Sequence, residues 1–235
     1  MEAIILAGGV GSRLKEAVSD VPKPMAPVSG RPFLEYLLDY WSNQGVTRVV
    51  LSVGYKHHII EQHFSGRYKG MAIDYAVETQ PRGTGGGLLL ALVHLREAGP
   101  FLVLNGDTFF EVALAPMHRF HEEKNAEVTI ALRSVESNSR YAGVEMDRNN
   151  SITAFDNRVR TSGRTLINGG VYLAERAAFS GMPMAEGRTS SLEDELYPSM
   201  LATRRRLYGY PSQGRFIDIG IPDDYRRAAE VLLEA

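Results

Sequence analysis

The chain has 235 residues, of which 44% are hydrophobic and 23% are charged, and it contains no cysteine. This length and composition predict one folded domain with a sizeable core, and they exclude disorder, disulfides and thiolate metal sites. The formal net charge is −2, so no overall positive field would attract a nucleic acid, and no apolar stretch approaches the roughly 20 residues needed to span a membrane.

The first predicted element is a buried strand at Glu2–Leu6, which a glycine-rich loop ends. The first residues of the sequence lack the basic segment followed by an apolar segment that is typical of a signal peptide, so a cytoplasmic location is expected. Gly8, Gly9 and Gly11 leave the backbone N–H groups of the loop open to an anion at the start of a helix. A tight strand-to-helix turn would contain the same glycines, so the loop alone does not decide between the two.

Basic residues follow the glycine loop at two places. Arg13 offers a guanidinium that can bind phosphate oxygens bidentately, and Lys23 offers a compact charge. Pro22 and Pro24 flank the lysine, and we expect them to hold it on a stiff, extended backbone. Together with the glycines, these residues favour a nucleoside triphosphate site.

The stretch Leu6–Leu14 followed by Pro22–Pro24 resembles the signature of the sugar-1-phosphate nucleotidyltransferases, L-A-G-G-x-G-[ST]-R-L and then P-K-P. The match to this signature is complete. The stretch Val21–Trp41 further resembles the guanylyltransferases that act on D-glycero-α-D-manno-heptose 1-phosphate in bacterial surface-polysaccharide pathways. The resemblance covers essentially the whole chain. It implies that Leu6, Ala7, Gly8, Gly9, Gly11, Ser12, Arg13 and Lys23 bind the nucleotide.

The following elements alternate between helix and strand. They are a helix at Phe33–Trp41 that Pro32 opens and Gly45 closes, a strand at Arg48–Val53, a helix at His57–Phe64, a strand at Met71–Val77, a helix at Gly86–Arg96 and a strand at Phe101–Asn105. This alternation predicts a Rossmann-like, mostly parallel sheet with helices on both faces and with ligands at the carboxyl ends of its strands.

A second glycine cluster at Gly83–Gly87 opens the last of these helices. It is typical of a loose loop, but it also resembles the base-binding loop of the family. The resemblance implies that Gly85 and Gln80, which precedes Pro81, contact the nucleobase. The residues do not indicate which base is bound.

Asn105-Gly106-Asp107 ends an apolar strand, so the carboxylate of Asp107 would emerge at the carboxyl edge of the sheet. A turn or helix cap is the ordinary use of such a sequence. Asp218 also lies between a strand and a helix, and it resembles the second metal-binding aspartate of the family. Two carboxylates with phosphate oxygens and water make a Mg²⁺ site, so Asp107 and Asp218 are the predicted metal ligands.

The second half of the chain is less regular. It contains a predicted helix at Met117–Lys124, a strand at Val128–Leu132, a hairpin formed by Val144–Asp147 and Ile152–Phe155 around Arg148–Ser151, a strand at Leu166–Leu173, a helix at Ser191–Thr203 opened by Ser190 and Glu193, and a helix at Pro222–Leu233. We therefore expect a single α/β domain over 1–235. Its nucleotide-binding half would span about 1–110, and its sugar-phosphate half, which contains the small hairpin, about 111–235.

The resemblance implies that Tyr141, Gly143, Asn168, Gly169 and Glu193 contact the sugar phosphate. Without it, Asn168-Gly169-Gly170 predicts a bulge or turn, and Glu193 a helix cap. Many relatives have a Glu-Lys pair before the sugar loop, but this chain has Asp156–Arg160 there and no lysine. Arg158 is the predicted replacement cation.

The implied reaction is attack by a sugar 1-phosphate on an NTP, with Arg13, Lys23 and Asp107 as catalytic residues and pyrophosphate as the leaving group. The expected ligands are GTP and D-glycero-α-D-manno-heptose 1-phosphate with Mg²⁺, and the product is a GDP-heptose. Mannose 1-phosphate, or UTP or dTTP with another sugar 1-phosphate, remains an alternative. No nucleic-acid or membrane partner is expected, and a homo-oligomer is left open.

Two remote alternatives are a dinucleotide-dependent oxidoreductase and a non-catalytic nucleotide sensor. The oxidoreductase motif G-x-G-x-x-G needs a glycine at Leu14, and no acidic residue follows the second strand at Val53–Tyr55 to bind a ribose. Retention of Lys23 and both aspartates argues against a sensor.

Overall fold

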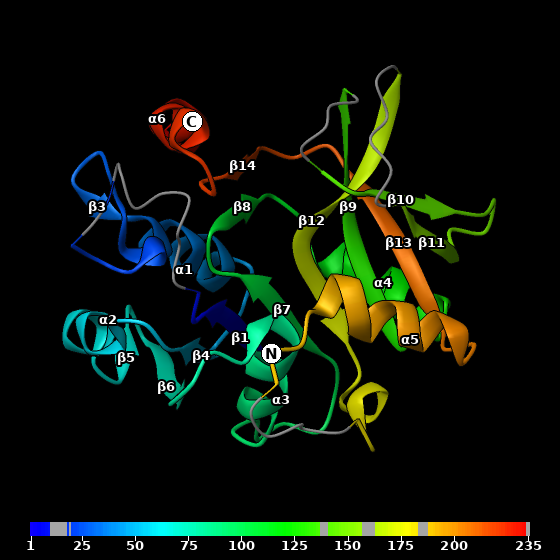
Figure 1. Cartoon of the computed structure of the whole chain (residues 1–235), viewed down its shortest axis with the longest axis horizontal. Helices are drawn as coiled ribbons and strands as arrows, with labels where there is room; N and C mark the ends of the chain where they lie inside the picture. The colour runs from blue at the N-terminus through cyan, green and yellow to red at the C-terminus, as the bar shows by residue number, and fades with distance from the viewer. Residues whose placement is uncertain (10–17, 19, 137–140, 157–162, 183–187, 234–235) are drawn as a thin grey trace.

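Four parallel strands form the N-terminal half of a large sheet in the computed structural model, which describes residues 1–9, 18, 20–136, 141–156, 163–182 and 188–233 (Figure 1). They are β1 (Glu2–Ala7), β4 (Arg48–Val53), β6 (Met71–Val77) and β7 (Phe101–Asn105), in the spatial order β7-β1-β4-β6. The helices between them are α1 (Phe33–Asn43), α2 (His57–Phe64) and α3 (Gly83–Leu92). The predicted α/β fold with a parallel sheet is thereby confirmed.

The C-terminal half continues the same sheet with mixed strand directions. β12 (Arg164–Ala174) pairs antiparallel with β7 and with β9 (Val128–Glu136), and β13 (Leu207–Ser212) lies parallel beyond β9. β10 (Gly143–Met146) and β11 (Ile152–Asp156) form the predicted hairpin beside β12. Asp147 holds its turn, because Oδ1 accepts N–H bonds from Asn149 and Ser151 at 2.8 and 2.9 Å.

Alternate strand residues pack on opposite faces of the sheet. Ile5 and Leu51 pack with α1, α2, α4 (Leu114–Glu123) and α6 (Pro222–Leu233), whereas Ile4 and Val50 pack with α3 and α5 (Tyr197–Ala202). All four of these strand residues are 0% exposed. Full burial of such side chains contributes about 1.5–3 kcal/mol each, so the two faces supply the core that the composition predicted.

The C-terminal helix returns to the N-terminal half. Figure 1 shows α6 on the same side of the molecule as β3 (Arg31–Pro32), which pairs with β2 (Pro27–Val28). Tyr225 on α6 donates a hydrogen bond to the carbonyl of Pro27 at 2.6 Å, and Ala228 and Leu232 are buried in the same core as α1. Consequently, β14 (Phe216–Asp218), which precedes α6, crosses between the halves and pairs with β8 (Thr108–Phe110).

Three predicted helices differ from the structure by three residues or more at one end. The helix predicted at Met117–Lys124 is α4, which begins at Leu114 and ends at Glu123. The helix predicted at Gly86–Arg96 is α3, which begins at Gly83 and ends at Leu92. The helix predicted at Ser191–Thr203 is a π-helical turn, η3 (Leu192–Leu196), followed by α5. Ser191 rather than Ser190 caps it, because the Ser191 hydroxyl accepts the N–H of Asp194 at 3.1 Å.

The remaining elements are short. They are η1 (Lys23–Met25), β5 (Arg67–Tyr68), which pairs with β6, and η2 (Arg176–Phe179). None of the helices in the described ranges combines the length and apolar character needed to cross a membrane.

His121 on α4 predicts a pH dependence of folding stability. Its side chain is 2% exposed, and Nδ1 lies 2.8 Å from Thr129 Oγ1. Burial, with a smaller contribution from His118, lowers the pKa of the imidazole from 6.5 to about 4. The unfolded chain therefore takes up a proton between pH 6.5 and 4 that the folded chain does not. We expect the free energy of unfolding to fall by roughly 3 kcal/mol as the pH falls through this window.

Urea unfolding at several pH values measures this loss in the parent and in His121→Gln. The variant retains a polar group that can face Thr129 but has no group that titrates in this range. Its unfolding free energy should therefore depend less steeply on pH. Equal slopes in the two proteins would show that His121 is not the titrating group.

Candidate active site

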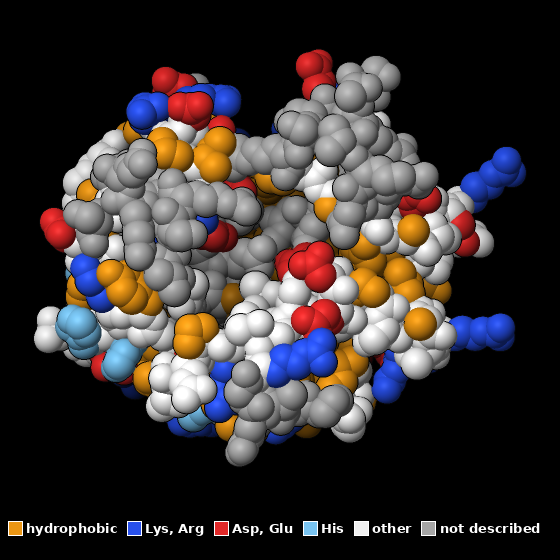
Figure 2. All heavy atoms as spheres, viewed as in Figure 1, with side chains coloured by type: hydrophobic (Ala, Val, Ile, Leu, Met, Phe, Trp, Pro, Cys, Tyr) orange, Lys and Arg blue, Asp and Glu red, His pale blue; other side chains and the backbone are white. Residues whose placement is uncertain are grey.

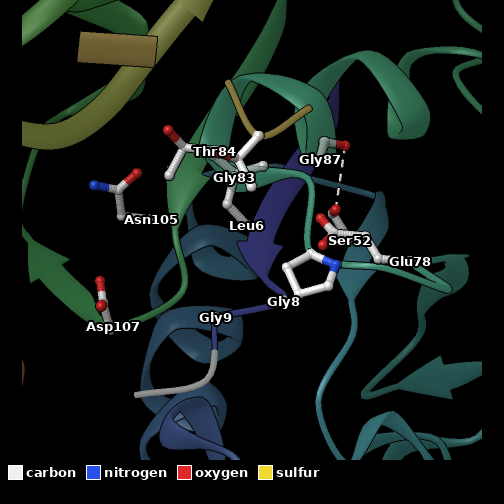
Figure 3. Close-up of a pocket in the computed structure, with 12 residues that line it drawn as sticks. Leu6, Gly8, Gly9, Ser52, Glu78, Gly83, Thr84, Gly87, Asn105 and Asp107 are labelled. Atoms are coloured by element: carbon white, nitrogen blue, oxygen red, sulfur yellow. Dashed lines mark hydrogen bonds between the residues drawn. The ribbon is translucent and has the colours of Figure 1, made fainter. Parts of the chain in front are cut away.

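A cavity of about 330 Å³ lies at the carboxyl ends of β1, β4 and β7, beside the N-terminus of α3 (Figure 3). Its lining residues are Leu6, Gly8, Gly9, Ser52, Glu78, Pro81, Gly83, Thr84, Gly87, Asn105, Asp107 and Thr189. The space-filling view shows a hollow between the two halves of the molecule, with acidic side chains at its edge (Figure 2). This is the edge of the sheet at which open α/β folds bind ligands.

The start of the predicted nucleotide loop lies in this cavity. Leu6, Gly8 and Gly9 line it, while Ala7 is buried at the end of β1. A Cβ at Gly8 would lie 3.1 Å from Glu78 Oε1, so the backbone approaches that carboxylate closely. The predicted nucleotide contacts Gly11, Ser12 and Arg13 lie outside the described residues.

Lys23 does not line the cavity but lies beside it, held by a tight turn rather than by the extended segment predicted from its prolines. Pro22 is extended, with φ −64° and ψ 149°, but a 3₁₀ turn starts directly after it, and Met25 N–H donates to the Pro22 carbonyl at 2.8 Å. The ammonium of Lys23 donates to Asp107 Oδ2 at 2.5 Å, and the lysine side chain is only 14% exposed. The turn therefore fixes a largely buried cation against a carboxylate that lines the cavity.

The two predicted metal aspartates lie next to the paired strands β8 and β14. Asp107 precedes β8 and Asp218 ends β14, and Ile219 N–H donates to the carbonyl of Asp107 at 3.0 Å. A Cβ on Gly220 would lie 2.8 Å from Asp218 Oδ1 and 3.3 Å from Lys23 Nζ. The ammonium of Lys23 is thus close to both carboxylates.

This donor set suits a hard divalent cation. Carboxylate oxygens are the protein ligands that Mg²⁺ prefers, and the site already holds one positive group against Asp107. Within the described ranges, no group of three or more His, Cys, Asp or Glu side chains could hold a metal ion. A metal bound by Asp107 and Asp218 would therefore complete its coordination with phosphate oxygens and water.

Glu78 is a cavity residue that the sequence analysis missed. Arg82 N–H donates to its Oε2 at 3.1 Å, and a Cβ on Gly87 would lie only 2.6 Å from its Oε1. Burial raises the pKa of this carboxyl above its usual value. Figure 3 shows Glu78 and Asp107 on opposite sides of the cavity. Gln80, the predicted base contact, is exposed and is not among the lining residues.

The glycines at the start of α3 differ in what they contact and in whether they line the cavity. Gly83 has φ +73°, and a Cβ there would lie 2.4 Å from the Ser190 carbonyl oxygen. Gly85, the other predicted base contact, lies against Ser190 and Leu196 and is not among the residues that line the cavity. Thr84 and Gly87 do line it. The cluster therefore lets the segment before η3 lie directly against the start of α3.

The predicted sugar contacts fall into two groups. Glu193 accepts hydrogen bonds from Tyr172 Oη at 2.9 Å, Asn168 Nδ2 at 3.4 Å and Thr84 Oγ1 at 3.3 Å, so it links the cavity to β12. The register of β12 against β9 shifts after Asn168, as a bulge would require. Gly169 fits closely against the ring of Phe110.

Tyr141 lies instead at a second cavity of about 490 Å³, between the end of β9 and the start of α6. Its lining residues are Arg133, Ser134, Val135, Glu136, Tyr141, Phe216, Ile217, Asp218, Asp224 and Arg227. Gly143 is buried and pairs with Asp156 and Ile167. Arg158 lies outside the described residues.

Comparisons with known proteins agree with this geometry. The profile of the nucleotidyl transferase family matches residues 2–235. The chain is 43% identical over 232 residues to a D-glycero-alpha-D-manno-heptose 1-phosphate guanylyltransferase of Aneurinibacillus thermoaerophilus, covering 99% of this chain and 98% of the relative. It is 36% identical over 225 residues to the enzyme of the same name from Campylobacter jejuni, covering 96% of this chain and 97% of the relative. The crystal structure of HddC from Yersinia pseudotuberculosis complexed with GMP-PN matches with a TM-score of 0.82 and 32% identity over 97% of this chain and 98% of that chain.

Proposed function

This chain belongs to the nucleotidyl transferase family, and we propose that it transfers the guanylyl group of GTP to D-glycero-α-D-manno-heptose 1-phosphate. The products would be pyrophosphate and a GDP-heptose for surface polysaccharide. The names of two relatives that match nearly end to end support the heptose, and the GMP-PN bound to the matching crystal structure supports a guanine nucleotide. We assign the reaction to the cytoplasm, where nucleoside triphosphates are made.

The structural observation that carries the choice of GTP is the carboxylate of Glu78 in the nucleotide cavity. The Watson–Crick edge of guanine has two adjacent donors, N1–H and N2–H₂, and an ionised carboxylate is a purely acceptor group with two oxygens. Uracil and thymine place one N–H donor between two carbonyl oxygens, which a carboxylate would repel. A half-buried Glu78 therefore favours guanine over both pyrimidines.

The opposite side of the cavity has the groups that phosphoryl chemistry requires. In the proposed reaction, a phosphate oxygen of the sugar 1-phosphate attacks the α-phosphorus of GTP, and the bond to the β-phosphate bridging oxygen breaks to release pyrophosphate. A phosphate monoester is largely ionised at neutral pH, so no strong general base is needed. Lys23 would hold the α-phosphate, and the backbone of Gly8 and Gly9, with Arg13, would hold the β- and γ-phosphates.

Asp107 and Asp218 would hold Mg²⁺ in this site. When bound, the ion supplies positive charge that offsets the charge developing on the phosphate oxygens. The protein then contributes alignment and fixed charges rather than covalent chemistry. We propose that the sugar lies against Asn168, Gly169 and Glu193 on one side and against Tyr141 and Gly143 on the other.

Pyrophosphate release, measured with a matrix of substrates, tests this function. GTP, UTP, dTTP and ATP would each be combined with D-glycero-α-D-manno-heptose 1-phosphate, mannose 1-phosphate and glucose 1-phosphate. We expect kcat/KM for GTP with the heptose phosphate to exceed that of every other pair by about tenfold or more, since one well-placed polar contact is worth that much. Comparable turnover with mannose 1-phosphate would overturn the sugar, and a preference for UTP or dTTP would overturn the base. GTP binding without pyrophosphate release from any pair would indicate a nucleotide sensor.

A further inference from the structure

The second cavity shares Asp218 with the Lys23 site but lies in the other half of the molecule. It is bounded by the end of β9, by β14 and by the first turns of α6. Two arginines, Arg133 and Arg227, line it together with the carboxylates of Glu136, Asp218 and Asp224. This cavity is therefore next to the proposed reaction centre and has its own positive groups.

The two arginines differ in what they contact. Arg227 Nη1 lies 3.7 Å from Asp224 Oδ1 on the same helix, so its charge has a partner. Arg133 Nη1 is buried and has no hydrogen-bond partner within the described part of the chain. A buried donor on a charged group without an acceptor is costly, and native proteins seldom retain one without a use. Arg133 thus lines the cavity with a guanidinium whose enclosed Nη1 has no acceptor among the described residues.

The position of Arg133 in the sheet is well fixed. It lies on β9 with a neighbour on each side, Ile167 on β12 and Ser212 on β13. The residue after Ile167 is Asn168, where the bulge in β12 begins. The guanidinium is therefore carried by the central part of the C-terminal half of the sheet rather than by a loop, which suits a group that must hold a ligand in one orientation.

We propose that Arg133 binds the phosphate group of the sugar 1-phosphate, an inference that rests on the proposed function. The planar guanidinium matches phosphate oxygens bidentately, and an anion in the cavity would give the charge of Arg133 a partner. Because Nη1 is enclosed in the empty protein, the side chain would turn toward the cavity when the anion binds. Two phosphate groups must approach each other in the reaction, and their repulsion requires a positive group on each side. Lys23 is already held by Asp107 on the nucleotide side. Arg133 supplies the positive group on the sugar side, the role that the sequence analysis gave to Arg158.

Steady-state kinetics of Arg133→Ala, Arg133→Lys and the control Arg148→Ala test this proposal. Arg148 is an exposed arginine at the tip of the β10–β11 hairpin in the same half. We expect Arg133→Ala to raise KM for the sugar 1-phosphate about 10- to 100-fold, because two charge-assisted hydrogen bonds are lost. The dissociation constant of GTP measured without sugar phosphate should stay within about twofold of the parent, since Arg133 lies outside the nucleotide cavity. Arg133→Lys should recover part of the loss, and Arg148→Ala should match the parent.

Direct binding of inorganic phosphate to the GTP-free protein gives a second measurement that does not depend on turnover. Calorimetry should show weaker phosphate binding by Arg133→Ala than by Arg148→Ala. If the parent has no activity with any sugar 1-phosphate but this difference is present, the proposed function fails and the anion site stands. If the parent is active and Arg133→Ala has the parent's KM and phosphate affinity, the inference is wrong. A loss of GTP affinity equal to the loss of sugar-phosphate affinity would also overturn it, because it would indicate a general structural defect.

Discussion

We expect Asp107→Asn to lower kcat by about 10²- to 10³-fold while the protein stays folded, since removal of one preorganised electrostatic group from a reaction centre has an effect of this size. The amide has the size of the carboxylate but no charge. It would weaken the contact with Lys23 and reduce the affinity for Mg²⁺. The main-chain bond between Asp107 and Ile219 does not involve the side chain, so β8 and β14 should remain paired. Initial rates together with the midpoint of thermal unfolding measure the two effects separately.

Asp223→Asn is the matched control for this variant. Asp223 lies five residues after Asp218, but its side chain is 82% exposed and pairs with Arg226 on the surface of α6. Its replacement should leave kcat unchanged. In the parent, an excess of EDTA should abolish turnover, and Mg²⁺ should restore it. Activity of Asp107→Asn close to that of the parent, or turnover that persists in EDTA, would refute the metal assignment.

The strands and helices of the nucleotide-binding half could be predicted from sequence, because the positions of their apolar residues match the positions that are buried in the structure. The strand at Arg48–Val53 and the helix at His57–Phe64 have the predicted bounds. β4 is buried along its whole length, its sequence is apolar except for Arg48 and Ser52, and Gly54 follows it. A run of apolar residues, a helical spacing of apolar residues and a glycine at the end of an element are properties of the local sequence, so no distant contact is needed to place these elements.

The glycine-rich start of α3 shows where this reasoning fails. Intrinsic propensity disfavours glycine in a helix by about 1 kcal/mol per residue, so the sequence predicts a later start. Distant segments decide the outcome, because a Cβ at Gly83 would meet the Ser190 backbone and one at Gly87 would meet Glu78. These close approaches require glycine, and the helix forms around them. Only the three-dimensional structure shows that Ser190 lies there.

The same limit applies to the candidate site. That Asp107 and Asp218 lie near each other could be predicted, because each lies at or just after the end of a strand and because a family resemblance pairs them. Glu78 also follows a strand, directly after Val77 at the end of β6, and that position was a usable signal. The resemblance drew attention to Gln80 instead, two residues further on. Arg133 has no local signal, because an arginine near the end of a strand is ordinary until the cavity beside it is known.

Glu78→Gln separates these two assignments of the base contact, and we expect it to weaken GTP binding about 10- to 150-fold. The reason is the loss of charge-assisted hydrogen bonds worth about 1.5–3 kcal/mol to the guanine donors. Glutamine keeps the size of the side chain and an oxygen that can accept the N–H of Arg82, so the loop before α3 should keep its shape. The dissociation constants of GTP and UTP, measured by calorimetry, give the effect. The affinity for UTP should fall little or should rise, because the amide of glutamine can both donate and accept hydrogen bonds, as the edge of uracil requires.

Gln80→Ala is the matched control. Gln80 is exposed, so the variant should bind GTP as the parent does. If Gln80→Ala loses GTP affinity while Glu78→Gln retains it, the base is bound by Gln80 and the carboxylate in the cavity has another role.

The pH dependence of GTP binding provides an independent test of Glu78. Burial raises the pKa of this carboxyl in the empty cavity, and only its ionised form accepts both guanine N–H groups. Bound guanine would favour the ionised form and lower the pKa again. GTP affinity should therefore fall as the pH falls through the raised pKa of Glu78, because binding then requires the release of a proton. Glu78→Gln has no such proton and should show a flatter profile over the same range. Parallel profiles in the two proteins would mean that another group titrates, and the carboxylate would then not be the group that selects guanine.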